Sequence, residues 1–309
     1  MIDCQGLTHA YASTDLALNG LTLQVAEGEC FGLIGANGAG KTTTLKILST
    51  LLVPTSGKAA IGGHDVARDY LRVRRMIGYM PESPPVFNEF KVGEFLTYAA
   101  AMHGLPAGDR KARVDAVLAL CDLGGKRDAW CSALSQGMRQ RLFLARSLVH
   151  DPAVLLLDEP TSGLDPAARI EFRHIMRELI AAGKTIVVSS HILPELSEFC
   201  TSVGIVERGK LVISGTVDDV LKSVATTQEI EVTVTGEASA VPAALRGFHG
   251  VVTVRLEGSR AIVEFNGPRD RHAAMLKTLV DAGVTVVSFG ERRATLEQIF
   301  MKVAAFETA

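Results

Sequence analysis

The stretch Gly35-Ala36-Asn37-Gly38-Ala39-Gly40-Lys41-Thr42 fits the pattern G-x-x-x-x-G-K-[ST] of a phosphate-binding loop. The glycines of this pattern let the backbone turn tightly, so that its N–H groups face inward and surround phosphate oxygens. The pattern positions the Lys41 side chain to reach the β- and γ-phosphates and the Thr42 hydroxyl to bind Mg²⁺. We therefore predict that this stretch binds the phosphates of a nucleotide.

The sequence on both sides of the loop supports this prediction. Residues 29–34 are typical of a short buried strand, and residues 43–52 are typical of a helix that ends before Pro54. The loop would then open onto a helix N-terminus, whose dipole favours anions. The alternative is a flexible glycine-rich loop that matches the pattern by chance, and the order strand, loop, helix argues against it.

Length and composition restrict the class of protein. A chain of 309 residues can form a large core, and its length predicts two domains. Its 47% hydrophobic and 21% charged residues are typical of a soluble globular protein. The net charge of −2 shows no strong electrostatic footprint for nucleic acid, so no nucleic-acid partner is expected. Five scattered cysteines without a C-x-x-C pair argue against a disulfide framework and favour a reducing compartment.

The sequence shows no targeting or membrane-spanning signal. Residues 1–11 lack the charged and apolar regions of a signal peptide. No apolar run approaches the ~20 residues that a membrane-spanning helix needs. We expect a cytoplasmic protein that reaches a membrane only through another protein.

Short apolar strands alternate with helical patterns through the first two thirds of the chain. Residues 154–157 and 185–189 read as buried parallel strands because their apolar residues do not alternate with polar ones, and residues 167–182 have helical spacing. This order predicts an α/β fold, with a parallel sheet flanked by helices. Helical patterns predominate in residues 84–150, so we predict an inserted helical subdomain within a first domain of residues 1–224.

The pattern changes after residue 224, and residues 225–309 are predicted to form a small second domain. The predicted elements are a linker at 225–227, strands at 229–234, 251–256, 261–265 and 284–289, and helices at 242–248, 269–282 and 296–303. The order β-α-β-β-α-β suggests an α+β, ferredoxin-like fold. This region has no dense cluster of acids, bases or thiols, so we expect a regulatory or docking role.

Two carboxylates end the apolar strand at residues 154–157. Successive strand residues point to opposite faces, so Asp158 and Glu159 cannot share one role. Asp158 suits a metal shell, and Glu159 suits the polarisation of an attacking water. A solvated turn is the alternative, but a phosphate loop already requires a metal partner.

The segment Leu134-Ser135-Gln136-Gly137-Met138 leads into a helical run. Ser135 is well placed to cap that helix. A small hydroxyl, a glycine backbone and a helix N-terminus also make a phosphate clamp. The residues alone leave both interpretations open.

The ordered set GANGAGKTT, LSQGM, LLLDEP, SGLD and Ser190-His191 resembles the nucleotide-binding subunit of ATP-binding cassette (ABC) transporters. The resemblance spans residues 1 to about 224 and implies a P-loop NTPase core of the ABC type. It also implies that two subunits face each other head to tail and close over two ATP molecules. The implied ATP contacts within one subunit are Tyr11, Gly35, Ala36, Asn37, Gly38, Ala39, Gly40, Lys41, Thr42 and Thr43.

Further roles follow from the same resemblance. It implies that Ser135, Gln136 and Gly137 contact the ATP held by the opposite subunit, and that Asp165 couples the two sites. Glu159 would be the catalytic base, and His191 would contact the γ-phosphate and hold the attacking water. Tyr11 would stack on adenine. Without the resemblance, Tyr11 would be a packed edge aromatic and His191 a strand-end histidine.

One departure from the family concerns Glu82, where many cassettes carry glutamine. The Glu82 side chain is as long as that of glutamine and keeps an acceptor oxygen, but it adds a negative charge. The predicted metal ligands are therefore Thr42, Asp158 and Glu82. A surface acid is the alternative. Residues 295–300 resemble the "LE-x-x-F" closing helix of drug, antibiotic and lipid exporters, and are otherwise an ordinary amphipathic helix.

The resemblance implies an ATP hydrolase that powers transport, in the export direction, with ATP and Mg²⁺ as cofactors. Its partners would be a second nucleotide-binding subunit and a separately encoded membrane subunit, which would hold it at the cytoplasmic face of the membrane. A soluble clamp of the DNA-repair or chromosome type would need a long coiled coil between Lys41 and Ser135. A translation-linked protein would need two cassettes, and a plain kinase or GTPase would lack LSQGM followed by LLLDEP.

Overall fold

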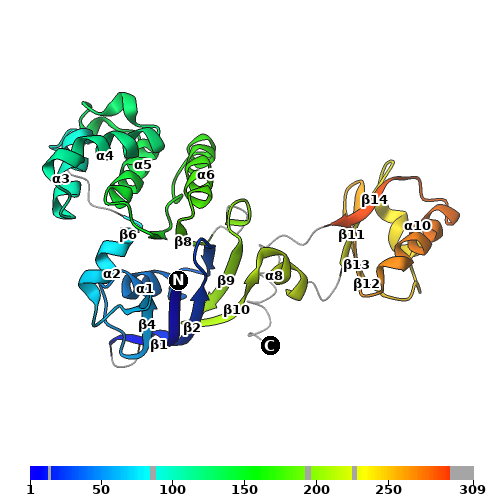
Figure 1. Cartoon of the computed structure of the whole chain (residues 1–309). Helices are drawn as coiled ribbons and strands as arrows, with labels where there is room; N and C mark the ends of the chain where they lie inside the picture. Colours follow the sequence, from blue (N-terminus) through cyan, green and yellow to red (C-terminus); the bar gives the residue numbers. More distant parts are fainter. Residues whose placement is uncertain (13–14, 84–87, 192–195, 225–227, 293–309) are drawn as a thin grey trace. The chain divides into compact units, whose positions relative to one another are not determined.

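The computed structural model describes residues 1–12, 15–83, 88–191, 196–224 and 228–292. The chain divides into two compact units, Met1–Val217 and Asp218–Ala309. Figure 1 shows the order of their elements along the chain. Helix α8 (Val217–Val224) follows the last strand of the first unit. The domain boundary predicted after residue 224 stays a prediction.

Six of the described strands form the central sheet of the first unit, in the order β10-β9-β3-β8-β7-β6. The strands are β3 (Cys30–Ile34), β6 (Ile77–Met80), β7 (Val154–Asp158), β8 (Thr185–Ser190), β9 (Ser202–Glu207) and β10 (Lys210–Thr216). Neighbours pair in parallel except for β9 and β10. Every residue of β3, β7 and β8 is buried, as expected where both faces of a sheet are covered. The predicted parallel sheet is confirmed.

A second, antiparallel sheet was not predicted from the sequence. Its order is β2-β1-β4-β5, formed by β1 (Ile2–Ala12), β2 (Asp15–Val25), β4 (Ser56–Ile61) and β5 (His64–Asp65). The register of β1 against β2 shifts between Cys4 and Leu7, which are both buried. The shift breaks the two-residue alternation by which a half-buried strand is recognised.

The helices of the first unit include α1 (Lys41–Leu48), α2 (Tyr70–Met76), α3 (Val92–Met102), α4 (Ala107–Leu120), α5 (Gln136–Leu148) and α6 (Pro166–Ala181). Helices α3, α4 and α5 lie together in the region predicted to be a helical subdomain (Figure 1). Helix α1 begins at Lys41 rather than Thr43, because Gly40 supplies the left-handed backbone (φ 110°) of the preceding residue. It ends at Leu48, short of the predicted Leu52, and Thr50 then turns with φ 64°.

The second unit contains β11 (Gln228–Val234), α9 (Val241–Ala244), β12 (Val251–Glu257), β13 (Arg260–Phe265), α10 (His272–Asp281) and β14 (Val286–Arg292). Its antiparallel sheet has the order β12-β13-β11-β14, and the predicted ferredoxin-like arrangement is confirmed. Buried side chains such as Val232, Phe265 and Met275 form its own core. Helix α9 is shorter than the predicted 242–248. The predicted closing helix at 296–303 lies outside the described residues.

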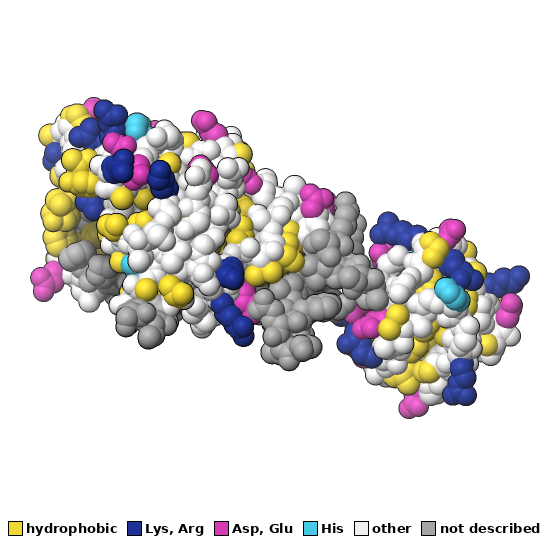
Figure 2. Space-filling model, turned by 90° about the horizontal axis from the view of Figure 1, so that it is seen from below, with side chains coloured by type: hydrophobic (Ala, Val, Ile, Leu, Met, Phe, Trp, Pro, Cys, Tyr) yellow, Lys and Arg dark blue, Asp and Glu magenta, His cyan; other side chains and the backbone are white. Residues whose placement is uncertain are grey.

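The visible faces of both units carry mixed charge. Figure 2 shows Lys and Arg side chains interspersed with Asp and Glu on each unit, in agreement with the net charge of −2. Among the described residues, no helix combines the length and apolar character needed to cross a bilayer.

Candidate functional site

The site lies where parallel strands of the central sheet end. The phosphate loop follows β3, and Glu82 follows β6. Asp158 is the last residue of β7, Glu159 comes directly after it, and His191 follows β8. Because these strands are parallel neighbours in one sheet, their carboxyl ends meet at a single edge. Segments that are far apart in the sequence are thereby brought to one place.

Two glycines of the loop are required by close packing. A Cβ atom on Gly35 would lie 2.4 Å from the Val206 carbonyl oxygen. A Cβ atom on Gly40 would lie 2.6 Å from the Ala17 carbonyl oxygen, and the φ of 110° at Gly40 also disfavours other residues. The loop therefore packs tightly against its neighbours while its other side borders a pocket.

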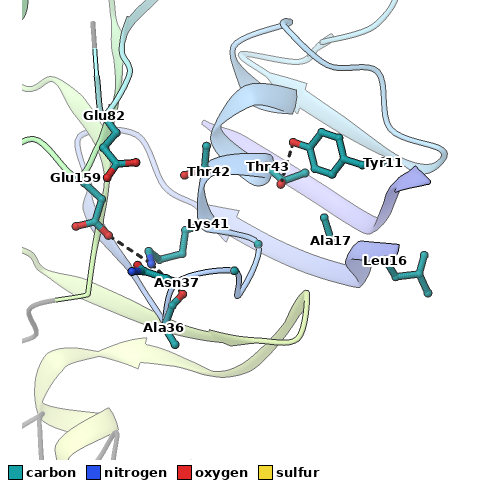
Figure 3. A pocket seen from close by; sticks show the side chains of 12 residues that line it. Tyr11, Leu16, Ala17, Ala36, Asn37, Lys41, Thr42, Thr43, Glu82 and Glu159 are labelled. Carbon is teal, nitrogen blue, oxygen red and sulfur yellow. Dashed lines mark hydrogen bonds and ion pairs between the residues drawn. The ribbon is translucent and has the colours of Figure 1, made fainter. Parts of the chain in front are cut away.

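The pocket has a volume of about 480 Å³ (Figure 3). Its lining residues are Tyr11, Leu16, Ala17, Ala36, Asn37, Gly38, Gly40, Lys41, Thr42, Thr43, Glu82 and Glu159. In the close-up, Glu82 and Glu159 lie on one side and Tyr11 and Leu16 on the other, with Lys41 and Asn37 between them. Eight of the ten predicted ATP-binding residues thus line one cavity, and Gly35 and Ala39 are not among its lining residues.

Lys41 is 5% exposed and is held within the loop. Its Nζ donates hydrogen bonds to the carbonyl oxygens of Gly35 (2.6 Å) and Ala36 (3.2 Å). The same ammonium lies 3.3 Å from Oε1 of Glu159. These contacts compensate the desolvation of a buried cation and aim it into the pocket.

Asp158 is 1% exposed and accepts two hydroxyl hydrogen bonds on Oδ1. Thr42 Oγ1 donates at 3.1 Å and Ser189 Oγ donates at 2.7 Å. Burial raises the pKa of Asp158, and the two hydrogen bonds oppose that rise. Thr42 and Asp158 thus bring hard oxygen donors together, which is the ligand chemistry that Mg²⁺ prefers.

Glu159 has a left-handed backbone, with φ 46°. Its N–H donates to Ser189 Oγ at 2.9 Å, and its Oε2 lies 2.8 Å from His191 Nδ1. With Lys41 on the other carboxylate oxygen, Glu159 is held between two cationic or proton-donating groups. Strained backbone of this kind persists where surrounding contacts fix it, and it is common at catalytic positions. His191, 45% exposed at its side chain, borders solvent.

Ser189 was not predicted to be a site residue. It is fully buried and contacts both acids, accepting from Glu159 and donating to Asp158. Strands β7 and β8 pair so that Asp158 lies opposite Ser189. A serine at the end of the neighbouring buried strand was the signal, but only the strand register reveals that it meets the acids.

Tyr11 lies at the opposite border of the pocket. Its hydroxyl is 3.3 Å from Thr43 Oγ1, and its ring packs edge to face against His9 with centroids 4.9 Å apart. Tyr11 and Leu16 are 56% and 51% exposed, so both present apolar surface that a planar base could cover. Leu16 and Ala17 were not predicted to line the site.

The predicted trans contacts lie elsewhere. Ser135 caps α5, its Oγ accepting from the Met138 N–H at 3.3 Å, and Asp165 caps α6, its Oδ1 accepting from the Ala168 N–H at 2.9 Å. Neither residue is among the described residues that line the phosphate-loop pocket. Gln136 lines a different cavity of about 450 Å³, which Glu82 also borders.

Comparison with known proteins places these features in a family. Residues 18–162 match the family described as ABC transporter, and residues 215–304 match the family described as ATP-binding protein DrrA1-3-like, C-terminal domain. The chain is 32% identical over 309 residues to the Nod factor export ATP-binding protein I of Ralstonia nicotianae, covering 99% of this chain and 94% of that protein. It is 35% identical over 287 residues to the daunorubicin resistance ATP-binding protein DrrA3 of Streptomyces coeruleorubidus, covering 92% and 90%.

A similar solved structure is the dimeric structure of MJ0796, a bacterial ABC transporter cassette. It has a TM-score of 0.64 and 25% identity, and the match covers 70% of this chain and 99% of that chain. Fold and site together define a P-loop ATPase domain with an inserted helical region. The chain belongs to the ATP-binding proteins of ABC transporters. The predicted ATP-binding and ATP-hydrolysing subunit is confirmed, and the alternative of a soluble clamp is not favoured.

Proposed function

We propose that this chain powers export through a separately encoded membrane subunit by hydrolysing ATP at sites that two nucleotide-binding subunits share. The observation that carries the proposal is that one chain places only some of the predicted ATP-contacting residues at its phosphate-loop pocket. Lys41 and Glu159 line the phosphate-loop pocket and His191 contacts Glu159, whereas Ser135 and Asp165 cap helices outside its described lining. The export-named relatives and the dimeric cassette support the same proposal.

The phosphates would lie against the loop amides, with Lys41 drawn toward the β- and γ-phosphates. Thr42 and Asp158 would hold Mg²⁺, with Glu82 at the border of the same pocket. When bound, the ion neutralises charge on the phosphate oxygens. The tyrosine face of Tyr11 would cover the adenine.

Glu159 would act as the general base for the attacking water. In the described structure its carboxylate is paired with Lys41 at 3.3 Å. Phosphate oxygens compete with this carboxylate for the lysine, so nucleotide binding would free Oε1 for water. His191, 2.8 Å from Oε2, would keep the carboxylate oriented and face the γ-phosphate.

The second half of each site would come from the opposite subunit. Ser135, Gln136 and Gly137 lie at the N-terminus of α5, where backbone N–H groups and the helix dipole favour a phosphate. Asp165, at the N-terminus of α6, would couple the two sites. The dimer of nucleotide-binding subunits would close when ATP binds and would loosen after ATP is hydrolysed.

The coupling to transport would pass through Glu82 and residues 84–101 to the membrane subunit, which would hold the chain at the cytoplasmic face. We assign residues 225–309 a regulatory or docking role, because their ferredoxin-like unit has its own core. Affinity purification from detergent-solubilised membranes should recover an integral membrane partner. Repeated recovery without one would favour a soluble ATPase.

Glu159→Gln tests the catalytic assignment. Loss of a general base lowers turnover by roughly 10²–10⁴-fold. We expect this variant to bind ATP, to lose steady-state hydrolysis and to accumulate an ATP-bound dimer on size-exclusion chromatography. Unchanged turnover would overturn the assignment.

Mixed subunits test the shared site. Lys41→Ala disables the phosphate loop of one subunit. Ser135→Arg blocks the contact that the other subunit makes with its partner's ATP. A mixture of the two variants should regain hydrolysis, because one complete site forms in each mixed dimer. No recovery, with both variants folded, would contradict the facing dimer.

A further inference from the structure

Arg141 is a buried charged residue in α5 that the site described above does not use. Its side chain is 8% exposed. Nη1 lies 2.8 Å from Asp122 Oδ2 and donates to the Asp122 carbonyl oxygen at 3.2 Å. Nη2 lies 3.3 Å from Glu171 Oε2 on α6. One guanidinium therefore connects α5 to α6 and to Asp122, two residues after the end of α4.

A buried guanidinium is costly unless it is paired. Nη1 and Nη2 are paired with Asp122 and Glu171, whereas Nε has no hydrogen-bond partner among the described residues. Asp122 has a left-handed backbone (φ 51°) that turns both its carbonyl and its carboxylate toward Arg141. The planar fork of arginine can bind two carboxylates at defined angles, whereas a lysine ammonium cannot. The contact therefore fixes an orientation as well as a distance.

The helices that Arg141 joins begin at the two predicted trans contacts. Arg141 lies six positions after the Ser135 cap of α5 (135 to 141), and Glu171 lies six positions after the Asp165 cap of α6 (165 to 171). The helix starts also touch, since a Cβ atom on Gly137 would lie 2.9 Å from the Ala168 Cβ. The Gly137–Ala168 contact lies at the helix starts, and the Arg141–Glu171 contact lies about one turn further along both helices. These two contacts fix the angle between α5 and α6.

We propose that Arg141 is a positioning residue that locks α5 to α6, so that Ser135 and Asp165 reach the partner's ATP as one rigid block. The proposal rests on the shared site proposed above. It assigns Arg141 to the half-site that a subunit gives to its partner. The phosphate loop of the same subunit does not depend on it.

Mixed dimers separate the two halves. Arg141→Met alone should lose hydrolysis by about 10²-fold, the effect of a small misplacement of reacting groups, while ATP binding to the subunit is retained. Mixed with Lys41→Ala, it should regain hydrolysis, because its own phosphate loop meets an intact partner block. A mixture of Arg141→Met with Ser135→Arg should not regain hydrolysis, because neither subunit then offers its partner an intact block.

Two further variants keep the test decisive if Arg141→Met fails to fold. Glu171→Gln changes a half-exposed partner and should show the same asymmetry between the two mixtures more weakly. Arg141→Lys should recover only part of the hydrolysis. Arg177→Met, an exposed change on α6, is the matched control and should behave as wild type in every mixture.

Recovery of hydrolysis with Ser135→Arg would overturn the role of Arg141, as would wild-type hydrolysis by both Arg141→Met and Glu171→Gln. Equal failure of folded Glu171→Gln in both mixtures would also overturn it, since a general structural defect has no such asymmetry. The mixture of Lys41→Ala with Ser135→Arg is measured in parallel. If that mixture fails, the shared site is wrong; if it succeeds and the asymmetry is missing, only the Arg141 assignment is wrong.

Discussion

Ser189 holds both acids of the site through a single buried hydroxyl. It donates to Asp158 at 2.7 Å and accepts from the Glu159 N–H at 2.9 Å. The bond to Asp158 opposes the rise in the pKa of that carboxyl, and the bond from the Glu159 N–H holds the left-handed backbone of Glu159. The geometry of the two acids therefore depends on a side chain from the neighbouring strand.

Ser189→Ala should impair both stability and hydrolysis. The Glu159 N–H would lose its acceptor, and a buried group left unsatisfied costs about 1–3 kcal/mol. The pKa of Asp158 would rise further, because its carboxylate loses the Ser189 hydrogen bond, and both acids would lose a contact that orients them. Urea unfolding and steady-state hydrolysis measure the two effects.

Ser147→Ala is the matched control for that experiment. Ser147 is also buried, and its hydroxyl donates to the Phe143 carbonyl oxygen at 2.9 Å, within α5. We expect a comparable loss of stability with little change in hydrolysis. If the two variants hydrolyse ATP equally well, Ser189 has no special role at the acids.

A histidine pair makes stability depend on pH. The rings of His103 and His150 stack with centroids 3.7 Å apart, and His150 Nε2 donates to the Ile77 carbonyl oxygen at 2.8 Å. Burial, and then the neighbouring His103, lower the pKa of His150 to about 4. The fold therefore favours the neutral imidazole.

The sign of the pH effect follows from this shift. An unfolded histidine has a pKa of about 6.5, so the unfolded chain binds this proton first as the pH falls. The stability that neutral His150 gives to the folded state is complete above about pH 6.5, and it is lost as the pH falls from there to about 4. His150→Gln removes it, so the wild type should lose about 1–2 kcal/mol more than the variant between pH 7 and 5, allowing for partial solvent screening. Identical pH slopes in urea unfolding would contradict this.

At the residue scale, local patterns predicted the parts of the site that one segment contains. Lys41, Thr42, Asp158 and Glu159 follow from spacing within the phosphate loop and at a strand end. Ser189 could not be predicted in the same way, because its contacts depend on the pairing of β7 with β8. The roles of Ser135 and Asp165 toward a partner rest on family resemblance, since each also serves as an ordinary helix cap.

At the scale of elements, α6 depends on its first residues. Asp165 accepts from the Ala168 N–H at 2.9 Å, and Pro166 occupies the first helical position. Asp165→Ala should therefore cost about 0.5–2 kcal/mol in thermal or urea unfolding. Asp165→Asn should keep the cap and most of the stability.

Hydrolysis by these two variants separates the cap from the proposed coupling role. If Asp165 acts only as a cap, Asp165→Asn should hydrolyse ATP as the wild type does. If it couples the two sites, Asp165→Asn should lose hydrolysis while remaining stable. Our proposal requires the second result.

Element boundaries show where the sequence pattern was insufficient. The helix at 43–52 was predicted from its apolar periodicity, but the true start at Lys41 is set by the backbone of Gly40. Strand β1 was missed because its buried residues change register near Gly6. Periodicity detects regular elements, whereas bulges and left-handed turns are set by pairing that the pattern does not contain.

At the scale of the whole molecule, the described residues of each unit contain a core cluster of their own. One cluster of buried side chains runs from Ile2 to Val206, and another runs from Ile230 to Val284. The ferredoxin-like order of the second unit was predictable because its strands and helices alternate cleanly in sequence. A second core implies a second unit of stability.

Urea should unfold the two units in separate transitions, and ATP in the presence of EDTA should shift only one of them. Phe172→Ala and Phe265→Ala are a matched pair, since both rings are fully buried, one in each unit. Each substitution should lower the free energy of unfolding of one transition by about 3–5 kcal/mol. Phe172→Ala identifies the transition of the first unit. ATP at 100 times its Kd should increase the free energy of unfolding of that transition by about 2.7 kcal/mol. Deletion of residues 225–309 should remove the other transition and leave ATP binding intact, whereas a single transition moved by both variants would show that the two cores fold as one.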